Sequence, residues 1–284
     1  MSNIISMSNI ILVDSSYTTF YRFFATLRWF SLAHMDIYKL HKDDPSYDWS
    51  LEPAFIEKYK KMYLESIINL VSQQVFNNSI VIFCLDSPQD TLWRKELYSC
   101  YKGDRTDLSL KNNFKPTFKI TYDTIIPNLT KEFTNIFTIK KHKIEADDII
   151  ALLVRYIKHK HPSKYIYLIS GDNDFLQLGY DKLYFGDYKK KILFQLTKEE
   201  AKNKLKEKIL NGDCSDNIPS IFFKKKINKT MKKLIQSDNN ELVKYLESNK
   251  EAYKQYLLNR TLINFKYIPK EYRKSIYHFI KSIL

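Results

Sequence analysis

Nine acidic residues in five short segments are the part of this 284-residue sequence best suited to chemistry. Hard divalent cations prefer oxygen ligands, and an all-carboxylate set favours Mg²⁺ or Mn²⁺ over zinc. If most of these carboxylates converge, their repulsion raises some pKa values unless a cation lies between them. Because there are more acids than one ion needs, we predict two Mg²⁺ ions, for which Mn²⁺ can substitute. The predicted metal ligands are Asp14, Asp86, Glu145, Asp147, Asp148, Asp172, Asp174, Asp213 and Asp216.

A pair of such ions indicates phosphodiester hydrolysis. In two-metal hydrolases the ions lie about 3.5–4 Å apart and stabilise the attacking and the leaving oxygen. One ion would generate hydroxide from water, and the other would stabilise the departing 3′ oxygen. Each segment also has a structural interpretation, because an aspartate after a strand often caps a turn or a helix. Acids in the first turn of a helix are likewise favoured by the helix dipole.

Three of the acids follow apolar runs that read as buried strands. Asp14 and Asp86 come directly after residues 10–13 and 80–85, and Asp172 follows residues 165–169 after a Ser-Gly pair. Continuous apolar runs are typical of a parallel sheet covered on both faces, whose ligands bind beyond the carboxyl ends of the strands. With a weaker strand near 136–139 and helices near 52–76, 117–134 and 146–160, the pattern predicts an α/β fold.

The net charge of +14 is concentrated in the last part of the chain. Residues 201–284 contain 19 Lys/Arg and 8 Asp/Glu, a net charge of +11. Such a region indicates a polyanionic partner, because neutralising phosphates releases counterions; an exposed Lys-rich surface without a partner is the alternative. The pattern also changes near residue 201 to short Lys-rich helical pieces. We therefore predict a sheet domain over 8–200 and a basic helical extension over 201–284 packed on it.

Membrane and secretory proteins are not favoured. No apolar run approaches the roughly 18–20 residues of a membrane span, and the first ten residues lack a basic segment before an apolar one. The three cysteines have no metal-ligand spacing. These features predict an intracellular protein with reduced cysteines.

The ordered acidic segments resemble the 5′-nuclease superfamily, which includes flap endonucleases and the 5′-exonuclease domains of bacterial DNA polymerases. Between the second and third segments, residues 92–105 resemble the arch of this superfamily, with Tyr101, Lys102 and Arg105 at its core positions. Residues 262–269 resemble the ribonuclease H enzymes of T-even bacteriophages, a branch of the superfamily. The matching acidic segments are Leu12-Val13-Asp14, Phe83-Cys84-Leu85-Asp86, Glu145-Ala146-Asp147-Asp148, Ser170-Gly171-Asp172-Asn173-Asp174 and Gly212-Asp213-Cys214-Ser215-Asp216-Asn217-Ile218-Pro219.

The resemblance implies a PIN-like nuclease domain with a helical arch at about 88–114 and a helix-three-turn-helix-like C-terminal region. It assigns the first four acids mainly to one metal site and the other five to a second site or its water shell. Lys102 and Arg105 would act in catalysis by steadying the scissile phosphate. Tyr101 could stack on a base next to the cut, and Arg94 and Lys95 could guide a single strand.

One segment departs from the superfamily pattern. Most relatives have a glycine-rich hairpin after the last acidic segment, where the backbone approaches duplex phosphates. Residues 220–230 contain no glycine. Lysine side chains are therefore the predicted substitute for binding nucleic acid, and a plain exposed cluster is the alternative. The lysines are Lys224, Lys225, Lys226 and Lys229.

The resulting hypothesis is a structure-specific 5′-3′ exonuclease or flap endonuclease acting near 5′ ends of DNA or RNA–DNA duplexes. The resemblance implies removal of RNA primers in replication, with a polymerase or a single-strand-binding protein as partner. One alternative is a single-strand ribonuclease on a PIN-like fold, which the arch-like segment disfavours. Another is a catalytically silent nucleic-acid-binding protein, which the full set of nine acids disfavours.

Overall fold

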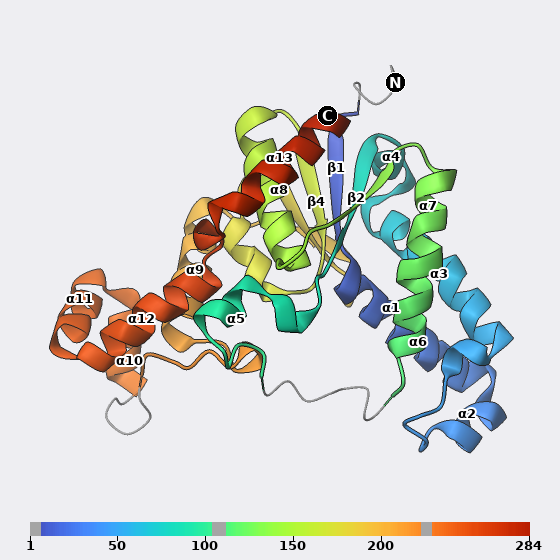
Figure 1. Cartoon of the computed structure of the whole chain (residues 1–284), viewed down its shortest axis with the longest axis horizontal. Coiled ribbons are helices and arrows are strands. Elements are labelled where there is room, and N and C mark those ends of the chain that lie inside the picture. The colour runs from blue at the N-terminus through green and yellow to red at the C-terminus, as the bar shows by residue number, and fades with distance from the viewer. Residues whose placement is uncertain (1–6, 104–111, 223–228) are drawn as a thin grey trace.

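A six-stranded sheet forms the centre of the computed structural model, which describes residues 7–103, 112–222 and 229–284 (Figure 1). The strand order is β3-β2-β1-β4-β5-β6, and every pair is parallel except β5–β6. The predicted α/β fold with a mostly parallel sheet is confirmed. The strands are β1 (Asn9–Asp14), β2 (Ser79–Leu85), β3 (Ile136–Lys140), β4 (Tyr165–Ile169), β5 (Leu183–Asp187) and β6 (Ile192–Phe194).

Both faces of the sheet are buried, which explains the continuous apolar runs. Ile10 and Leu12 of β1 pack on one face, and Ile11 and Val13 pack on the other. Successive side chains of a strand point to opposite faces, so a strand covered on both sides must be apolar throughout.

The first face is covered by α8 (Ala146–Lys160) and α13 (Lys270–Ile283), which run across it in Figure 1. Ile276 and Ile280 of α13 are fully buried in the same core cluster as α8 and the strands. The division into 8–200 and 201–284 stays a prediction. The structure adds that the last helix shares the core of the sheet domain.

The second face is covered by α1 (Ser15–Ala33), α3 (Pro53–Val71), α4 (Gln73–Asn77), α6 (Lys115–Ile120) and α7 (Ile126–Glu132). The predicted helix 52–76 is broken at Ser72, whose φ of 82° lies outside the helical region. The predicted helix 117–134 is two helices joined by the π-helical turn Thr121–Ile125. Helix α1 and the short α2 (Met35–His41) were not among the predicted elements.

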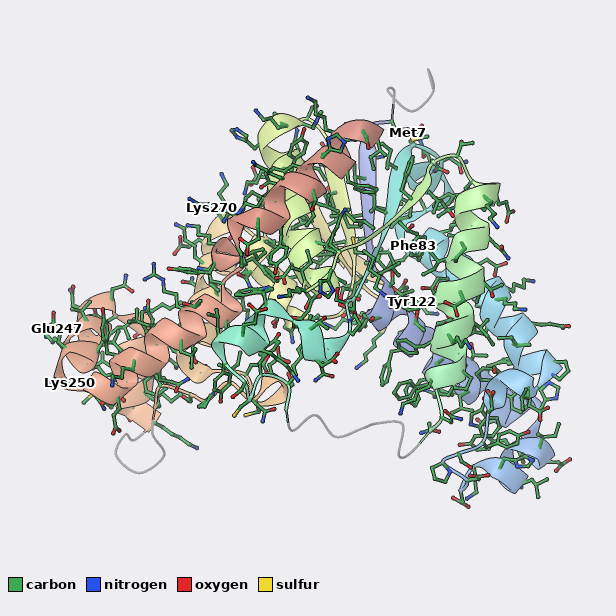
Figure 2. All side chains as sticks on the ribbon, in the orientation of Figure 1. Met7, Phe83, Tyr122, Glu247, Lys250 and Lys270 are labelled. Carbon is green, nitrogen blue, oxygen red and sulfur yellow. The ribbon has the colours of Figure 1, made fainter. Side chains whose placement is uncertain are left out.

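A helical lobe extends from the sheet domain on one side. It contains α9 (Lys198–Asn211), α10 (Lys229–Ser237), α11 (Asn239–Ser248) and α12 (Lys250–Ile263). Figure 2 shows Glu247 and Lys250 at its outer end, away from Phe83 in the sheet. The short α5 (Trp93–Leu97) lies between this lobe and the start of α8 (Figure 1). Among the described residues, no helix is long and apolar enough to cross a membrane.

Candidate active site

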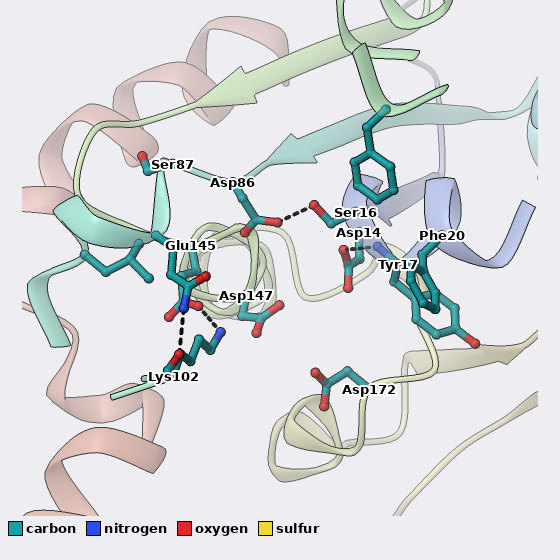
Figure 3. A pocket seen from close by; sticks show the side chains of 13 residues that line it. Asp14, Ser16, Tyr17, Phe20, Asp86, Ser87, Lys102, Glu145, Asp147 and Asp172 are labelled. Atoms are coloured by element: carbon teal, nitrogen blue, oxygen red, sulfur yellow. Dashed lines mark hydrogen bonds and ion pairs between the residues drawn. The ribbon is translucent and has the colours of Figure 1, made fainter. Parts of the chain in front are cut away.

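The carboxyl ends of β1, β2 and β4 bring three aspartates to one edge of the sheet (Figure 3). Asp14 ends β1 and caps α1, since its Oδ1 accepts the N–H of Tyr17 at 3.0 Å. Asp86 follows β2 and accepts the N–H of Ala146 at 2.7 Å, which ties it to the start of α8. Asp172 follows β4 beyond Gly171. A Cβ atom at that glycine would lie 2.2 Å from the hydroxyl of Tyr17, so a larger residue there would have to displace the end of this side chain.

Five acids line one cavity of about 420 Å³ at this edge. Lys102 is the one basic residue among the described residues that line it, and no Cys or His does. An oxygen-only donor set with excess negative charge fits a hard divalent cation and does not fit a thiolate-bound metal. The five acids are Asp14, Asp86, Glu145, Asp147 and Asp172.

Two acids of this cavity, Asp14 and Asp147, have raised pKa values because they are buried beside other acids. Burial, followed by the charge of Asp86, raises the pKa of Asp14 to about 7. Burial, followed by the charges of Asp172 and Asp14, raises the pKa of Asp147 well above its ordinary 3.8. A carboxylate with a raised pKa is costly to ionise when no cation is near. A bound cation therefore stabilises such a carboxylate most.

A second acidic group adjoins the cavity. The carboxylate oxygens of Asp174, Asp213 and Asp216 lie within 4.8 Å of one another. The N–H of Asp174 donates to Asp172 at 2.8 Å, which connects this group to the first cavity. The structure therefore brings eight of the nine predicted acids into two neighbouring groups.

Lys208 of α9 contacts the second group and was not identified from the sequence. Its Nζ pairs with Asp174 and lies 2.8 Å from Asp213. Burial would raise the pKa of Asp213, but hydrogen bonds from Lys208 and Ser215 lower it. The ammonium group thus balances charge in the way a bound cation would. Its position five residues before Asp213, in a Lys-rich helix, gave no distinguishing signal.

Asp148 is the exception, because it lies in neither acidic group. It is fully buried and faces α5, where Arg94 Nη2 donates to its Oδ1 at 2.7 Å and Trp93 Nε1 donates to its Oδ2 at 2.8 Å. Successive helical residues point about 100° apart, so Asp147 faces the cavity while Asp148 faces away from it.

Arg94 and Tyr101, which the sequence predicts to bind nucleic acid, are buried as well. Each side chain is 3% exposed. Arg94 Nη1 donates to Glu145 Oε2 at 2.9 Å in addition to its bond with Asp148, and the hydroxyl of Tyr101 donates to the same Glu145 oxygen at 3.0 Å. Neither residue is open to guide a strand or to stack on a base, because both hold the start of α8.

Lys102 lies where the sequence predicts a catalytic cation. Its Nζ pairs with Glu145 at the cavity wall (Figure 3). Its backbone N–H donates to the carbonyl of Asp216 at 3.0 Å. Burial would raise the pKa of Glu145, but Lys102 and Arg94 lower it to about 2. Glu145 is therefore held as an anion between two cations.

The remaining predicted residues are two lysines at the surface and four residues outside the described ranges. Lys95 is partly exposed and Lys229 is exposed at the start of α10, so their contacts with nucleic acid stay predictions. Four further residues lie outside the described residues: Arg105, Lys224, Lys225 and Lys226.

Residues 9–208 match the model of the 5′-3′ exonuclease, N-terminal resolvase-like domain. The chain belongs to the 5′-3′ exonuclease family. Ribonuclease H of Enterobacteria phage T4 is 26% identical to this chain over 247 residues, which cover 81% of this chain and 79% of the phage protein.

Solved structures share its fold. A bacteriophage T5 protein co-crystallized with metal ions matches with a TM-score of 0.63 and 17% identity, over 97% of this chain and 99% of its own. Bacteriophage T5 flap endonuclease, in a pseudo-enzyme–product complex with DNA and metal ions, matches with a TM-score of 0.61 and 18% identity, over 97% and 98%. Because both structures match 97% of this chain, the similarity in fold extends beyond the sheet domain to the C-terminal helices.

Proposed function

We propose that this chain is a divalent-metal-dependent nuclease that hydrolyses phosphodiesters near the 5′ ends of DNA or RNA–DNA duplexes, including flaps. The observation that carries the proposal is the cavity lined by five acids from β1, β2, α8 and β4 beside one lysine, in a member of a nuclease family. The products would carry 5′-phosphate and 3′-hydroxyl groups.

The two acidic groups would hold two Mg²⁺ ions. Asp14, Asp86, Asp147 and Asp172 would serve the first site, and Asp174, Asp213 and Asp216 would serve the second. Such ions activate water at neutral pH and neutralise charge that develops on a phosphate. Glu145 would position Lys102 through their ion pair, and Lys102 would donate to an oxygen of the scissile phosphate.

The substrate class is supported by charge and by relatives. The net charge of +11 in residues 201–284 suits a duplex. The T5 flap endonuclease relative was solved with DNA, and the T4 relative is a ribonuclease H. Removal of RNA primers during replication is the task that we propose on this basis.

Replacing cavity acids tests the chemistry. Asp172→Asn is expected to remove most Mg²⁺-dependent cleavage of a labelled 5′-flap duplex, and Asp86→Asn should do the same. Asp181→Asn, at an exposed acid, is the matched control. Undiminished cleavage by Asp172→Asn would exclude that residue from the mechanism. Preference for unpaired RNA over flaps and nicked duplexes would instead indicate a single-strand ribonuclease.

A further inference from the structure

Arg22 is a buried cation without an acidic partner. It lies on α1 and is 8% exposed. Its Nε is buried without a hydrogen-bond partner, and the side chain forms no ion pair with any residue in the described ranges. Its guanidinium lies 5.5 Å from the ring centroid of Tyr21. Burial lowers the pKa of Arg22, and the nearby groups that oppose this shift are tyrosines, not carboxylates.

The other deeply buried arginine of the described chain shows what such a charge ordinarily requires. Arg94 is paired with two carboxylates at 2.7 and 2.9 Å. A buried charge is costly unless it is paired and hydrogen-bonded. The surroundings of Arg22 therefore lack the negative charge that the surroundings of Arg94 contain.

A cavity of about 220 Å³ adjoins Arg22, between α1, α3 and the β5–β6 turn. Arg22 and Lys191 supply positive charge there, and none of the described residues that line it is acidic. This cavity shares no lining residue with the acidic cavity. Its polar lining consists of Tyr21, Arg22, Ser66, Asn69, Tyr188 and Lys191.

Neighbouring hydroxyl groups are buried without partners as well, but they do not explain Arg22. Ser15 and Thr26 lie with Arg22 on the buried side of α1, and neither hydroxyl has a hydrogen-bond partner in the described chain. Ordered water can satisfy buried hydroxyls. An anion would balance the guanidinium charge and accept a hydrogen bond from its unpaired Nε, which a water molecule does only in part.

We propose that this cavity binds a phosphate group through Arg22 and Lys191. The planar guanidinium matches the geometry of phosphate oxygens, and Asn69 adds a neutral donor. The Tyr21 and Tyr188 rings stack at 4.6 Å and border the site, so a sugar or base attached to the phosphate has an apolar surface to contact. The phosphate belongs either to a free nucleotide or to a nucleic-acid strand.

Thermal unfolding with inorganic phosphate tests the site. In EDTA, at an ionic strength held constant with NaCl, the midpoint of the wild-type protein should rise with phosphate concentration, because a ligand that binds only the folded state stabilises it. Arg22→Met should lose this rise. Arg28→Met, at an exposed arginine on the same helix, should keep it. An equal rise in the wild type and Arg22→Met would overturn the proposal.

A second pair of variants covers the case in which Arg22→Met does not fold. Lys191→Gln should raise the apparent Kd for phosphate about three- to fivefold, as expected for loss of one partly solvated charge. Lys189→Gln, at an exposed lysine of the same turn, should leave the Kd unchanged. Identical Kd values for both variants would also overturn the proposal.

The source of the phosphate is decided by titrating a nucleoside 5′-monophosphate and a short duplex in EDTA. Binding of the monophosphate that depends on Arg22 assigns a free nucleotide, and binding of the duplex alone that depends on Arg22 assigns a strand. If neither probe binds in a way that depends on Arg22, the proposed site is contradicted. Flap cleavage by Arg22→Met in Mg²⁺ is measured separately, so failure of this site is distinguishable from failure of the proposed nuclease activity.

Discussion

Asp147 and Asp148 are neighbours at the start of α8, yet they belong to regions with opposite electrostatics. Asp147 faces the acidic cavity, where burial and then the charges of neighbouring acids raise its pKa. Asp148 faces a buried ion cluster with Arg94 and Trp93. The cavity holds like charges that destabilise one another, whereas the cluster holds opposite charges that stabilise one another.

The two aspartates therefore have different roles: Asp147 contributes charge to the acidic cavity, and Asp148 helps to hold the start of α8 in place. The cavity acids keep excess negative charge, as a cation site requires. The cluster fixes α5 and Lys102 against α8 through Glu145, which contacts both Arg94 and Lys102. One acidic motif would therefore supply metal ligands on one side and forms a buried ion pair on the other.

The largest expected effect is the loss of stability in Arg94→Met. Removing one partner leaves the charges of Asp148 and Glu145 buried, which costs about 3–5 kcal/mol. Urea unfolding at pH 7 measures this change. Adding Asp148→Asn should recover part of the loss, because one unpaired charge is removed. A stability change below about 1 kcal/mol, the level of an exposed ion pair, would show that the cluster is not a buried structural unit.

Asp147→Asn changes the acidic cavity, and it should lower cleavage without lowering the stability of the metal-free protein. Cleavage should fall by about 10²–10³-fold, as for loss of a group that stabilises transition-state charge. Stability without metal should stay equal or rise, since a repelling charge is removed. Cleavage rates and urea unfolding in EDTA are the two readouts. Asp123→Asn, at an exposed acid, should change neither quantity.

The two regions should also respond oppositely to pH in the absence of metal. Asp14 has a pKa raised from 3.8 to about 7, so the folded protein holds this proton more tightly than the unfolded chain. The wild-type protein should therefore lose stability relative to Asp14→Asn as pH rises from about 4 to 7, by at most about 1.4 kcal/mol per pH unit. Urea unfolding in EDTA across this range measures the difference. A difference that does not change with pH would contradict the raised pKa.

Glu145 contributes with the opposite sign. Its pKa is lowered from 4.5 to about 2, so its ion pairs stabilise the fold fully above about pH 4.5. That contribution is lost as pH falls through about 2. Acid unfolding of the wild type should thus begin in the buried cluster and not in the cavity.

The smallest expected effect is that of Trp93→Phe. This change removes the indole N–H bond to Asp148 but leaves both bonds from Arg94. The expected loss is about 1 kcal/mol, the net value of one hydrogen bond. Urea unfolding gives the value, and a loss as large as that of Arg94→Met would mean that the indole, not the guanidinium, holds Asp148.

Strands β1, β2 and β4 could be predicted because each is a continuous apolar run, and the acids at their ends followed from the parallel arrangement. Strands β5 and β6 were not predicted; β6 has only three residues, and none of them is fully buried. Helix α1 could not, because Ser15, Thr18 and Thr19 begin its buried side and weaken the apolar periodicity. The predicted long helices were interrupted where backbone geometry, as at Ser72, departs from the helix. Local composition does not reveal such breaks.

The set of acids could be predicted, but their individual orientation could not. The spacing of Glu145 and Asp148 correctly indicated that they share a face, and both contact Arg94. What that face meets depends on where α5 packs, which is a tertiary property. For the same reason the sequence placed Arg94 and Tyr101 on nucleic acid, whereas packing buries them.

The most direct test of the two-ion account is a crystal structure with Mn²⁺, using anomalous scattering to locate the ions. The account predicts one peak beside Asp14, Asp86 and Asp147, and a second beside Asp174, Asp213 and Asp216, with Lys208 displaced from its carboxylate partners. A peak beside Asp148, or no peak in either acidic group, would contradict it.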